Sequence, residues 1–303
     1  MQSVVALFDS DLLMNSGILL LDKPLGLTSN AALSRAKRVL GIRKAGHTGA
    51  LDPLATGLLP LCFGQATKVS AFLLDADKGY MADILLGQTT ASGDAEGEVI
   101  ERREVPEISG AALEQVLDEF RGPIDQVPPM YSALKHKGRR LHELARAGIE
   151  VERKPRRVTI HGLDVLTFES PHLKLRVKCT KGTYIRSLAM DIGQRLGCGA
   201  HLSGLRRESS GPFALADAVS LARLEEMEPA EARALLLPPD AALTALPQVT
   251  LNAGDATDIG HGKVVATNAA PAEHVRIYAP DGFMGIGRIE QDGKLRVRRL
   301  FVG

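Results

Sequence analysis

The stretch GHTGALDPLATGLLPLCFGQATK, from Gly46 to Lys68, contains a single acidic residue, Asp52. Its four glycines and two prolines predict a shaped loop that runs into an apolar segment. Pro53 biases the backbone of Asp52 toward extended conformations, so a rigid turn can present the carboxylate. Such a carboxylate can act as a nucleophile or as a base. An ordinary Asx turn, in which Asp52 only stabilises its own loop, is the alternative that this spacing leaves open.

The sequence lacks the motifs that hold common cofactors and metals. No GxxxxGK[ST] phosphate loop, dinucleotide fingerprint, HExxH zinc motif or GxSxG nucleophile elbow occurs in it. Asp94, Glu96 and Glu98 form a Gly-rich acidic turn, but the turn lacks the full ligand ladder of an EF-hand. We therefore predict chemistry without cofactor or metal. The side chains that could perform it are Asp52, Tyr80, Tyr184 and Arg186.

Strands and helices must position these side chains. GILLLDKPLGLTSN predicts a short strand, a Pro/Gly turn and a helix that is capped by Ser29 or Asn30 and ends at Gly41. Apolar residues at helical spacing predict a second helix between Ser109 and Gly122. LKLRVKCT alternates apolar and basic residues, which indicates a half-buried strand with a basic outer face, and SLAMDIGQRLG predicts a helix that ends at Gly197. Because these elements lack a regular βαβ order, we expect an α+β domain.

The last fifth of the chain has a different texture. LLLPPDAALTALPQ has the Pro and Ala content of a linker, and short apolar runs punctuated by glycine follow it, which predicts a small all-β domain from about Pro247. We therefore expect a catalytic domain over residues 1–246 and a small domain over residues 247–303. The last strand places Lys294, Arg296 and Arg298 on one face, which is either an edge that contacts RNA or a solvated strand face.

Composition limits the class of protein. The 303 residues are 45% hydrophobic and 24% charged, which favours a folded chain, and the net charge is only +1. Positive charge is instead concentrated locally, with nine Lys or Arg against three Glu from Lys135 to Arg157. The start of the chain has no secretory pattern and no apolar run is long enough to span a bilayer. Three cysteines fit no disulfide or metal pattern and are expected to be buried, so we expect a cytoplasmic protein.

Five motifs, in their order along the chain, closely resemble those of the bacterial tRNA pseudouridine synthase B family. They are LDKP, GHTGALDPLATGLLPLCFGQATK, DKGYMADILLGQTTASGDAEGE, VPPMYSALKHKGRRLHELARAG and CTKGTYIRSLAMDIGQRLGCGAHLSGLRR. The likeness extends from about Gly17 to about Leu221 and is looser around the basic segment, at about residues 128–158, and after Leu221. The resemblance implies an enzyme that isomerises the uridine in the T loop of tRNA, at position 55, to pseudouridine.

The resemblance also implies a fold and a site. The fold is that of the pseudouridine synthases, a mixed sheet with flanking helices, followed by a PUA-like RNA-binding domain. Asp52 in ALDPLATG is implied to be the catalytic residue, Arg186 in GTYIRSL to pair with it and Tyr80 in KGYMA to lie against the target base. The family further implies that Tyr184 and Leu205 shape the uridine pocket, that His47 supports the flipped-out RNA loop and that Lys23 lies near the site.

The implied reaction agrees with the missing motifs, because moving the ribose C1′ bond from uracil N1 to C5 involves no net change of atoms or electrons. The carboxylate could attack the ribose C1′, attack the base C6 or abstract a ribose proton to give a glycal, and the sequence leaves these three open. The basic segment is expected to be a mobile insertion that clamps phosphates, although charge runs are often solvated surface. We expect the chain to act on the T arm of tRNA as a monomer, without a membrane or an obligatory protein partner.

Other functions remain to be weighed against this one. The chain could be a tRNA-binding or folding factor in which isomerisation is secondary, or a relative that depends on a guide RNA. A glycosidase with Asp52 as nucleophile and Asp75 or Asp77 as acid would break a related bond, but it requires two carboxyl groups at a defined separation.

Overall fold

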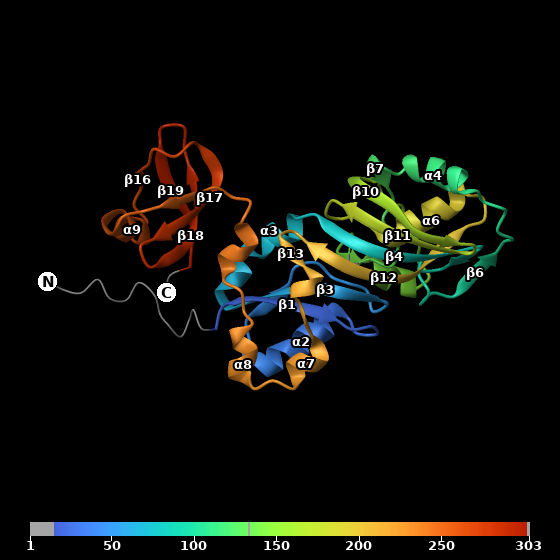
Figure 1. Ribbon diagram of the computed structural model, residues 1–303, viewed down its shortest axis with the longest axis horizontal. Coiled ribbons are helices and arrows are strands. Elements are labelled where there is room, and N and C mark those ends of the chain that lie inside the picture. The colour runs from blue at the N-terminus through green and yellow to red at the C-terminus, as the bar shows by residue number, and fades with distance from the viewer. Residues whose placement is uncertain (1–14, 133, 302–303) are drawn as a thin grey trace.

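The computed structural model describes residues 15–132 and 134–301 of the chain. It confirms the α+β class, with a ten-stranded mixed sheet flanked by helices and a second, smaller sheet toward the C-terminus (Figure 1). Residues 1–14, on which the expectation of no secretory signal depends, lie outside the described part. Within that part, no helix is both long enough and apolar enough to cross a bilayer.

The large sheet runs in the order β14-β1-β3-β12-β4-β11-β10-β7, with β2 beside β3 and β13 beside β12. Its strands are β1 (Gly17–Lys23), β2 (Ala45–His47), β3 (Ala55–Phe63), β4 (Lys78–Leu86), β7 (Gly122–Gln126), β10 (Arg156–Glu169), β11 (His172–Cys179), β12 (Ala200–Ser210), β13 (Phe213–Ala214) and β14 (Val219–Ser220). The β1–β14 and β3–β12 pairs are parallel. The β3–β12 pair sets Ala55 opposite Leu205, so the loop before β3 lies next to the centre of the sheet.

Two groups of helices cover different parts of this sheet (Figure 1). One group packs on β1 and β3 and consists of α2 (Ser29–Leu40), α7 (Leu221–Glu225) and α8 (Pro229–Ala234). The other packs on β4, β10, β11 and β12 and consists of α4 (Gly110–Asp118) and α6 (Ile185–Arg195). Each group buries its own apolar cluster, and Tyr80 and Leu205 pack against both clusters. Tyr80 and Leu205 therefore lie where the two apolar clusters meet.

The first predicted helix forms as α2, but its cap differs from the prediction. Thr28 is the N-cap, because its hydroxyl accepts a hydrogen bond from the Ala31 N–H at 3.1 Å. The expected cap Ser29 is instead buried inside the helix, and its hydroxyl is bonded to the main chain of Leu51. Gly41 ends the helix as predicted, in the left-handed conformation with φ of +70°.

The other predicted elements are confirmed with shifted ends. Ser109 caps α4, which ends at Asp118, short of the predicted limit at Gly122. Strand β11 buries every second residue, Leu173, Leu175, Val177 and Cys179, as its alternation predicts. Helix α6 begins at Ile185, two residues before the predicted start, so Arg186 lies in its first turn.

The C-terminal sheet runs in the order β15-β17-β18-β19-β16, with one short helix beside it. Its elements are β15 (Gln248–Thr250), α9 (Ala253–Gly260), β16 (Val265–Ala266), β17 (Ala272–Ala279), β18 (Gly282–Ile289) and β19 (Lys294–Leu300). The segment expected to be a linker does not extend freely but packs through η3 (Pro239–Leu243), in which Leu243 is 1% exposed. Apolar contacts outweighed the linker-like composition there, because Leu243 packs in one cluster with Ile286 and Phe301 of the small sheet.

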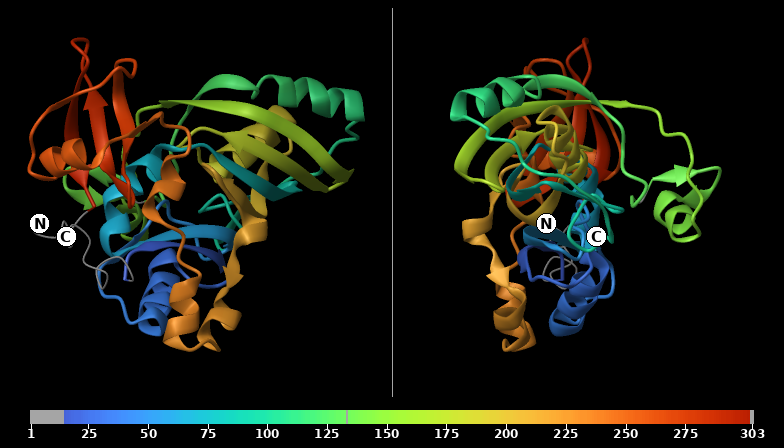
Figure 2. Two further views of the ribbon diagram at one scale, coloured as in Figure 1. Left: turned by 60° about the vertical axis from the view of Figure 1, so that its left-hand side comes forward. Right: turned by 90° about the vertical axis from the view of Figure 1, so that its right-hand side faces the viewer.

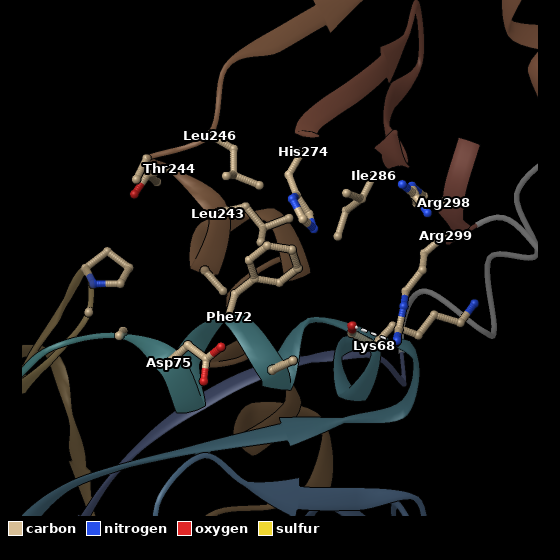
Figure 3. A pocket seen from close by; sticks show the side chains of 16 residues that line it. Lys68, Phe72, Asp75, Leu243, Thr244, Leu246, His274, Ile286, Arg298 and Arg299 are labelled. Carbon is tan, nitrogen blue, oxygen red and sulfur yellow. Dashed lines mark hydrogen bonds between the residues drawn. The ribbon is translucent and has the colours of Figure 1, made fainter. Parts of the chain in front are cut away.

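A cavity of about 780 Å³ lies where the small sheet meets the large domain (Figure 3). The rings of Phe72, from α3 (Ser70–Asp75), and His274 meet in it edge to face, with centroids 5.2 Å apart. On another side, Lys68 of η1 (Gly64–Val69) donates to the Leu300 carbonyl at 2.6 Å, and Arg299 donates to the Lys68 carbonyl at 3.0 Å. The two parts of the chain therefore share both apolar and polar contacts.

The basic face of β19 is present but electrically compensated. Lys294, Arg296 and Arg298 are all exposed, as the alternation predicts. Each forms an ion pair with an acid of the same sheet or of its turns, namely Asp292, Glu290 and Glu273. This pairing supports the reading of a solvated strand face more than that of an edge built to receive phosphates.

The basic segment projects from the body of the molecule (Figure 2, right view). Its described elements are the small hairpin β8 (Lys135–His136) and β9 (Arg139–Arg140) and the helix α5 (Leu141–Arg146). A second hairpin, β5 (Gln88–Thr90) and β6 (Val99–Arg102), carries the acidic turn between its strands. The remaining short helix, η2 (Leu215–Asp217), follows β13.

Candidate active site

The loop between β2 and β3 presents Asp52 and is fixed on both sides. The Ser29 hydroxyl accepts from the Leu51 N–H at 2.7 Å and donates to the Leu51 carbonyl at 3.0 Å. The Gly26 N–H donates to the Pro53 carbonyl at 2.8 Å, and the Ala55 N–H closes the turn on the Asp52 carbonyl at 3.0 Å. The Asp52 side chain itself stays 48% exposed. The loop is therefore rigid while its carboxylate faces open space.

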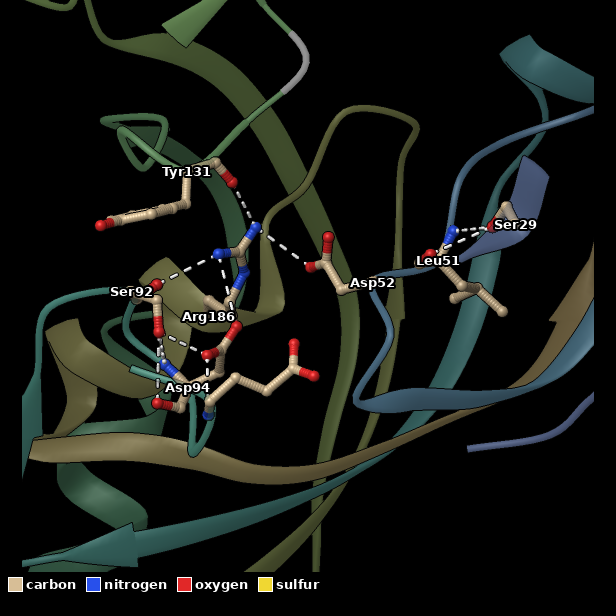
Figure 4. A network of polar contacts seen from close by, with 8 residues as sticks. Ser29, Leu51, Asp52, Ser92, Asp94, Tyr131 and Arg186 are labelled. Carbon is tan, nitrogen blue, oxygen red and sulfur yellow. Dashed lines mark hydrogen bonds and ion pairs between the residues drawn. The ribbon is translucent and has the colours of Figure 1, made fainter. Parts of the chain in front are cut away.

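Arg186 holds this carboxylate from the first turn of α6. One guanidinium nitrogen forms an ion pair with the Asp52 carboxylate at 3.0 Å and donates a hydrogen bond to the Tyr131 carbonyl at 2.7 Å (Figure 4). The other donates to the Ser92 carbonyl at 3.1 Å and lies 3.4 Å from the Asp94 carboxylate. With its side chain only 7% exposed and its nitrogens bound on several sides, Arg186 has one orientation, so it aims the Asp52 carboxylate.

Asp94 anchors Arg186 and is itself anchored. Its side chain is 4% exposed, and it accepts hydrogen bonds from the Ser92 hydroxyl and, at 3.2 Å, from the Glu96 N–H. The Thr90 hydroxyl donates to the Asp94 carbonyl at 2.7 Å. The acidic turn, considered above as a metal loop, thus binds an arginine. The Asp94 carboxylate is buried, whereas the Asp52 carboxylate on the other side of Arg186 is exposed.

Two adjoining cavities meet at Asp52 and Arg186. One, of about 320 Å³, is lined by both of these residues and by Tyr80, Tyr184 and Leu205. The other, of about 550 Å³, is lined by both and by His47, Asp94 and Tyr131, among others. Six of the seven residues implied by the resemblance therefore line this pair of cavities. Because Asp52 lines both cavities, a ligand bound in either one could contact its carboxylate.

The seventh residue, Lys23, lies beneath the loop and lines neither cavity. It is fully buried at the end of β1, and its ammonium group donates to the carbonyls of Pro24 and Leu27 at 2.9 and 2.6 Å. Burial lowers its pKa to about 8, against the attraction of Asp52. Lys23 therefore supports the turn after β1 and acts on Asp52 through its charge.

The walls of the smaller cavity come from separate elements. Tyr80 projects from β4 and Leu205 from β12, and Tyr184 precedes α6. Gln126 fixes the backbone of Tyr184, because its amide accepts from the Tyr184 N–H at 2.7 Å and donates to the Tyr184 carbonyl at 3.0 Å. Two aromatic rings and an aliphatic side chain thus form an apolar wall beside a carboxylate.

Opposing effects act on the ionisation of Asp52. Desolvation has the largest effect and raises the pKa of the Asp52 carboxyl group above the ordinary 3.8. The charge of Asp94 also raises this pKa, whereas the charges of Arg186 and Lys23 lower it. Burial raises the pKa of Tyr80 and of Tyr184, so both are phenols at neutral pH. Burial and the charge of Arg207 lower the pKa of His47, so its imidazole is neutral. The site therefore offers one exposed carboxylate, that of Asp52, held by the guanidinium of Arg186.

Sequence reasoning missed two residues beside the site. Asp94 was weighed only as a metal ligand, and Arg207, which lines the smaller cavity, was not considered. The doubled arginine in GLRRES was the available signal for the second, because in an alternating strand one of two neighbours must face inward. Arg206 faces the other way and pairs with Asp22 at 2.7 Å.

The acids of the glycosidase alternative do not join Asp52. Asp75 pairs with Lys181 at 2.7 Å and Asp77 with His161 at 3.2 Å, and all four of these side chains are exposed. Neither acid lines either of the two cavities that Asp52 lines. The described residues thus lack the required acid partner at either of the expected positions, and that reading is disfavoured.

Comparison with solved structures defines the class of the fold. A chain of a Cbf5–Nop10–Gar1 complex superimposes with a TM-score of 0.74 at 28% identity, over 96% of this chain and 87% of that chain. A chain of an H/ACA RNP bound to a substrate RNA containing 2′-deoxyuridine gives a TM-score of 0.72 at 26% identity, over 97% and 87%. The similarity spans both the large sheet and the small C-terminal sheet.

Sequence comparison identifies the family within this class. Residues 37–185 match the N-terminal domain of the TruB family of pseudouridylate synthases, residues 186–244 a tRNA pseudouridylate synthase B C-terminal domain and residues 247–301 a pseudouridine synthase II TruB C-terminal domain. The tRNA pseudouridine synthase B of Azoarcus sp. (strain BH72) is 52% identical over 94% of both chains. That of Dechloromonas aromatica (strain RCB) is 54% identical over 94% of this chain and 95% of its own. The chain belongs to the TruB family of pseudouridylate synthases, as its motifs predict.

Proposed function

We propose that this chain isomerises a uridine of tRNA to pseudouridine, with Asp52 as the catalytic residue. The observation that carries the proposal is the Asp52–Arg186 ion pair at the junction of two cavities, in a chain of this family. We propose the uridine at position 55 in the T loop as the target, because the motifs resemble those of the enzymes that modify it.

The reaction conserves every atom of the nucleotide. The bond from the ribose C1′ to uracil N1 breaks, a bond from C1′ to C5 forms, and one proton passes from C5 to N1. An ionised carboxylate can begin this exchange by attack on C1′ or C6 or by removal of a ribose proton. Arg186 keeps Asp52 oriented, and its charge opposes the rise in the pKa of the carboxyl group that desolvation in the site causes. Arg186 therefore favours the ionised form of Asp52, which the reaction requires.

The smaller cavity is suited to an extruded base. Tyr80, Tyr184 and Leu205 supply apolar surface for uracil on the side next to Asp52. Stacking of one aromatic ring on a base contributes about 1–3 kcal/mol, comparable with the few kcal/mol that flipping a nucleotide out of its stack costs. Tyr80 would hold the detached uracil while it rotates. His47, in the adjoining cavity, would support the rest of the opened loop.

The remaining parts of the chain would bind the body of the tRNA. We propose residues 1–246 as the catalytic domain, residues 247–303 as a PUA-like RNA-binding domain and the segment at about 128–158 as a basic insertion. We further propose that the chain acts as a monomer, without a guide RNA or an obligatory protein partner, in the cytoplasm. The three buried free thiols, Cys62, Cys179 and Cys198, support a reducing compartment.

Asp52→Asn tests the proposal directly. The pure chain is mixed with a T-arm hairpin that carries tritium at C5 of the target uridine, and tritium release and hairpin binding are measured. We expect the variant to lose at least about 100-fold in rate, because an amide cannot act as nucleophile or base, while its affinity for the hairpin changes little. Full-rate modification by the variant would remove Asp52 from the mechanism.

The same assay separates the other functions. If the chain is an RNA-folding factor with incidental catalysis, the parent and the Asp52→Asn variant should change the folding of tRNA to the same extent. A guide-dependent enzyme would release no tritium from pure protein and hairpin alone. Release of free uracil in place of a tritiated water signal would indicate net cleavage of the glycosidic bond.

A further inference from the structure

Arg207 is the largest fully buried side chain in the described part of the chain, at 1% exposure. Its guanidinium donates to the Leu58 carbonyl at 2.6 Å and to the Gly49 carbonyl at 3.1 Å. Within residues 15–132 and 134–301 it has no ion pair with a carboxylate. A buried charge without a counter-charge costs free energy, so such a residue calls for a partner that carries negative charge at some stage.

The register of the sheet gives Arg207 its neighbour. Arg207 on β12 is directly opposite Tyr80 on β4, so both side chains project from the same face of the sheet. Both line the 320 Å³ cavity with Asp52. Arg207 thus lies beside the phenol that we place against the target base. It also holds the Gly49 carbonyl of the loop that carries Asp52.

The reaction supplies the missing negative charge. One proton must leave C5 and one must be added to N1, and a tyrosine can transfer both without any co-reactant. After C5 of the detached uracil has bonded to C1′, the phenol gives its proton to N1 and the resulting phenolate takes the proton from C5, which regenerates the phenol. Between these two transfers the oxygen of the tyrosine is an anion in a buried site, which is unfavourable unless a cation stabilises it.

We propose that Arg207 is a positioning residue that stabilises negative charge on the Tyr80 oxygen while this tyrosine transfers the proton from C5 to N1. The inference rests on the proposed function and assigns Tyr80 a chemical role in addition to stacking. Arg207 acts through Tyr80 and does not itself touch the reacting carbons.

The other groups around Tyr80 do not provide this stabilisation. Cys179 on β11 and Asp52 on the loop raise the pKa of Tyr80, and Arg207 is the charged neighbour that lowers it against the larger effect of burial. Burial raises the pKa of the Cys179 thiol to about 11, so this thiol is neutral in the working range. Lys78, two residues before Tyr80 on β4, is bonded to the carbonyls of Leu73, Leu74 and Ala76. Burial and Arg207 lower its pKa to about 8.

A purely structural role for Arg207 would have different consequences. Its bonds to Leu58 and Gly49 fix two backbone segments, so its loss will destabilise the fold in either case. A structural role would slow the reaction to the same degree whether or not position 80 carries a hydroxyl. If Arg207 acts through the Tyr80 phenol, its effect on the rate requires the Tyr80 hydroxyl. Its loss then also shifts the pH at which Tyr80 titrates. The two readings are therefore separable by a readout specific to Tyr80.

The first measurement is the titration of Tyr80 in Arg207→Gln. The phenolate absorbance of the full chain is followed against pH, and the curve of the matching chain with Tyr80→Phe is subtracted. We expect Tyr80 to titrate at higher pH in Arg207→Gln than in the parent. The matched control is Arg206→Gln, at the preceding position, whose side chain lies on the opposite face of the sheet. We expect its titration curve to coincide with that of the parent. The titration needs no turnover, so it reports on Arg207 even if the proposed function fails.

The second measurement is a double-mutant cycle on the single-turnover rate with the tritiated hairpin. We expect Arg207→Gln to lower the rate about 10- to 100-fold in the parent, with little change in hairpin affinity, and by less than about threefold in Tyr80→Phe. If melting shows that Arg207→Gln does not fold, Arg207→Lys takes its place in both measurements. It keeps a charge but loses the planar fork, so a smaller shift and a smaller rate loss are expected. An equal rate loss in both backgrounds, or an unmoved Tyr80 titration, would overturn the proposal.

Discussion

At the scale of single residues, the site depends on a guanidinium shared between two carboxylates of different exposure. Arg186 lies between Asp52, which is 48% exposed, and Asp94, which is 4% exposed. The buried carboxylate helps to fix the arginine in place, and the exposed one remains available to a ligand.

Asp94→Asn should separate the effects of charge and of position. Asp94 raises the pKa of Asp52, so its neutralisation should lower that pKa and move the acidic limb of the pH–rate profile to lower pH. At neutral pH the rate should fall about 10- to 100-fold, because Arg186 loses the ion-pair partner that helps to hold it in position. Single-turnover rates on the T-arm hairpin across pH check both effects.

The control for this experiment is Glu101→Gln, which removes an exposed acid of the same hairpin that pairs only with Arg103 among the described residues. Its acidic limb should coincide with that of the parent. An acidic limb in Asp94→Asn that moves to higher pH would contradict the assigned sign.

At the scale of elements, the basic segment is less uniformly available to phosphates than its composition indicates. Arg153 pairs with Glu150 at 3.0 Å and also donates to the Pro128 carbonyl, and Arg157 pairs with Asp125 at 3.1 Å. Lys154 and Arg156 are exposed and have no such acidic partner within the described residues. Arg156 also lies close enough to Tyr184 to lower the pKa of that phenol. These two cations are therefore the better candidates for RNA contacts.

Neutralising Lys154 and Arg156 together should flatten the salt dependence of RNA binding. Each phosphate contact contributes about 0.7 to 0.9 to the slope of log affinity against log salt, so the slope should fall by about 1.4 to 1.8. Hairpin affinity measured over a range of salt concentrations gives this slope. The paired cations Arg153 and Arg157 serve as the comparison, because their neutralisation should change the slope less. An unchanged slope in the first variant would show that this part of the segment does not meet RNA.

At the scale of the whole molecule, the two sheets are joined by a common apolar cluster. Ile286 and Phe301 of the C-terminal part pack with Ile18, Leu58 and Phe213 of the large domain. The Lys68 ammonium lies 5.3 Å from the centre of the Phe301 ring and bonds to the neighbouring Leu300 carbonyl. Because this contact is apolar and buried, the C-terminal part is held in place and is not a loosely tethered module.

Phe301→Ala should therefore destabilise the whole chain. Removal of a ring that is 2% exposed is expected to cost about 3–5 kcal/mol and to lower the denaturant midpoint, with one transition seen by probes in both sheets. Val264→Ala, in the same part of the chain and 37% exposed, should change stability by less than about 0.5 kcal/mol. Two separate transitions in the parent chain would contradict the shared core.

Features that depend on near neighbours or on long shared motifs could be predicted from the amino-acid sequence. The alternation of β11, the caps of α4 and α2 at Ser109 and Gly41, and the burial of the three thiols follow from local pattern and hydrophobicity. The family and the α+β class followed from the motifs, as did five of the side chains that line the cavities beside Asp52. These features could be predicted because each depends on a short stretch of chain or on motifs that are visible in the sequence.

The folded structure was needed to show which side chains lie close together. Thr28 caps α2 because Leu51, far along the chain, engages the Ser29 hydroxyl. Asp94 binds an arginine because α6 brings Arg186 to the acidic turn. Arg207 is buried opposite Tyr80 because β12 pairs with β4 in one particular register, and a shift of one residue would have exposed it. Contacts of this kind depend on distances between distant segments, which no local pattern specifies.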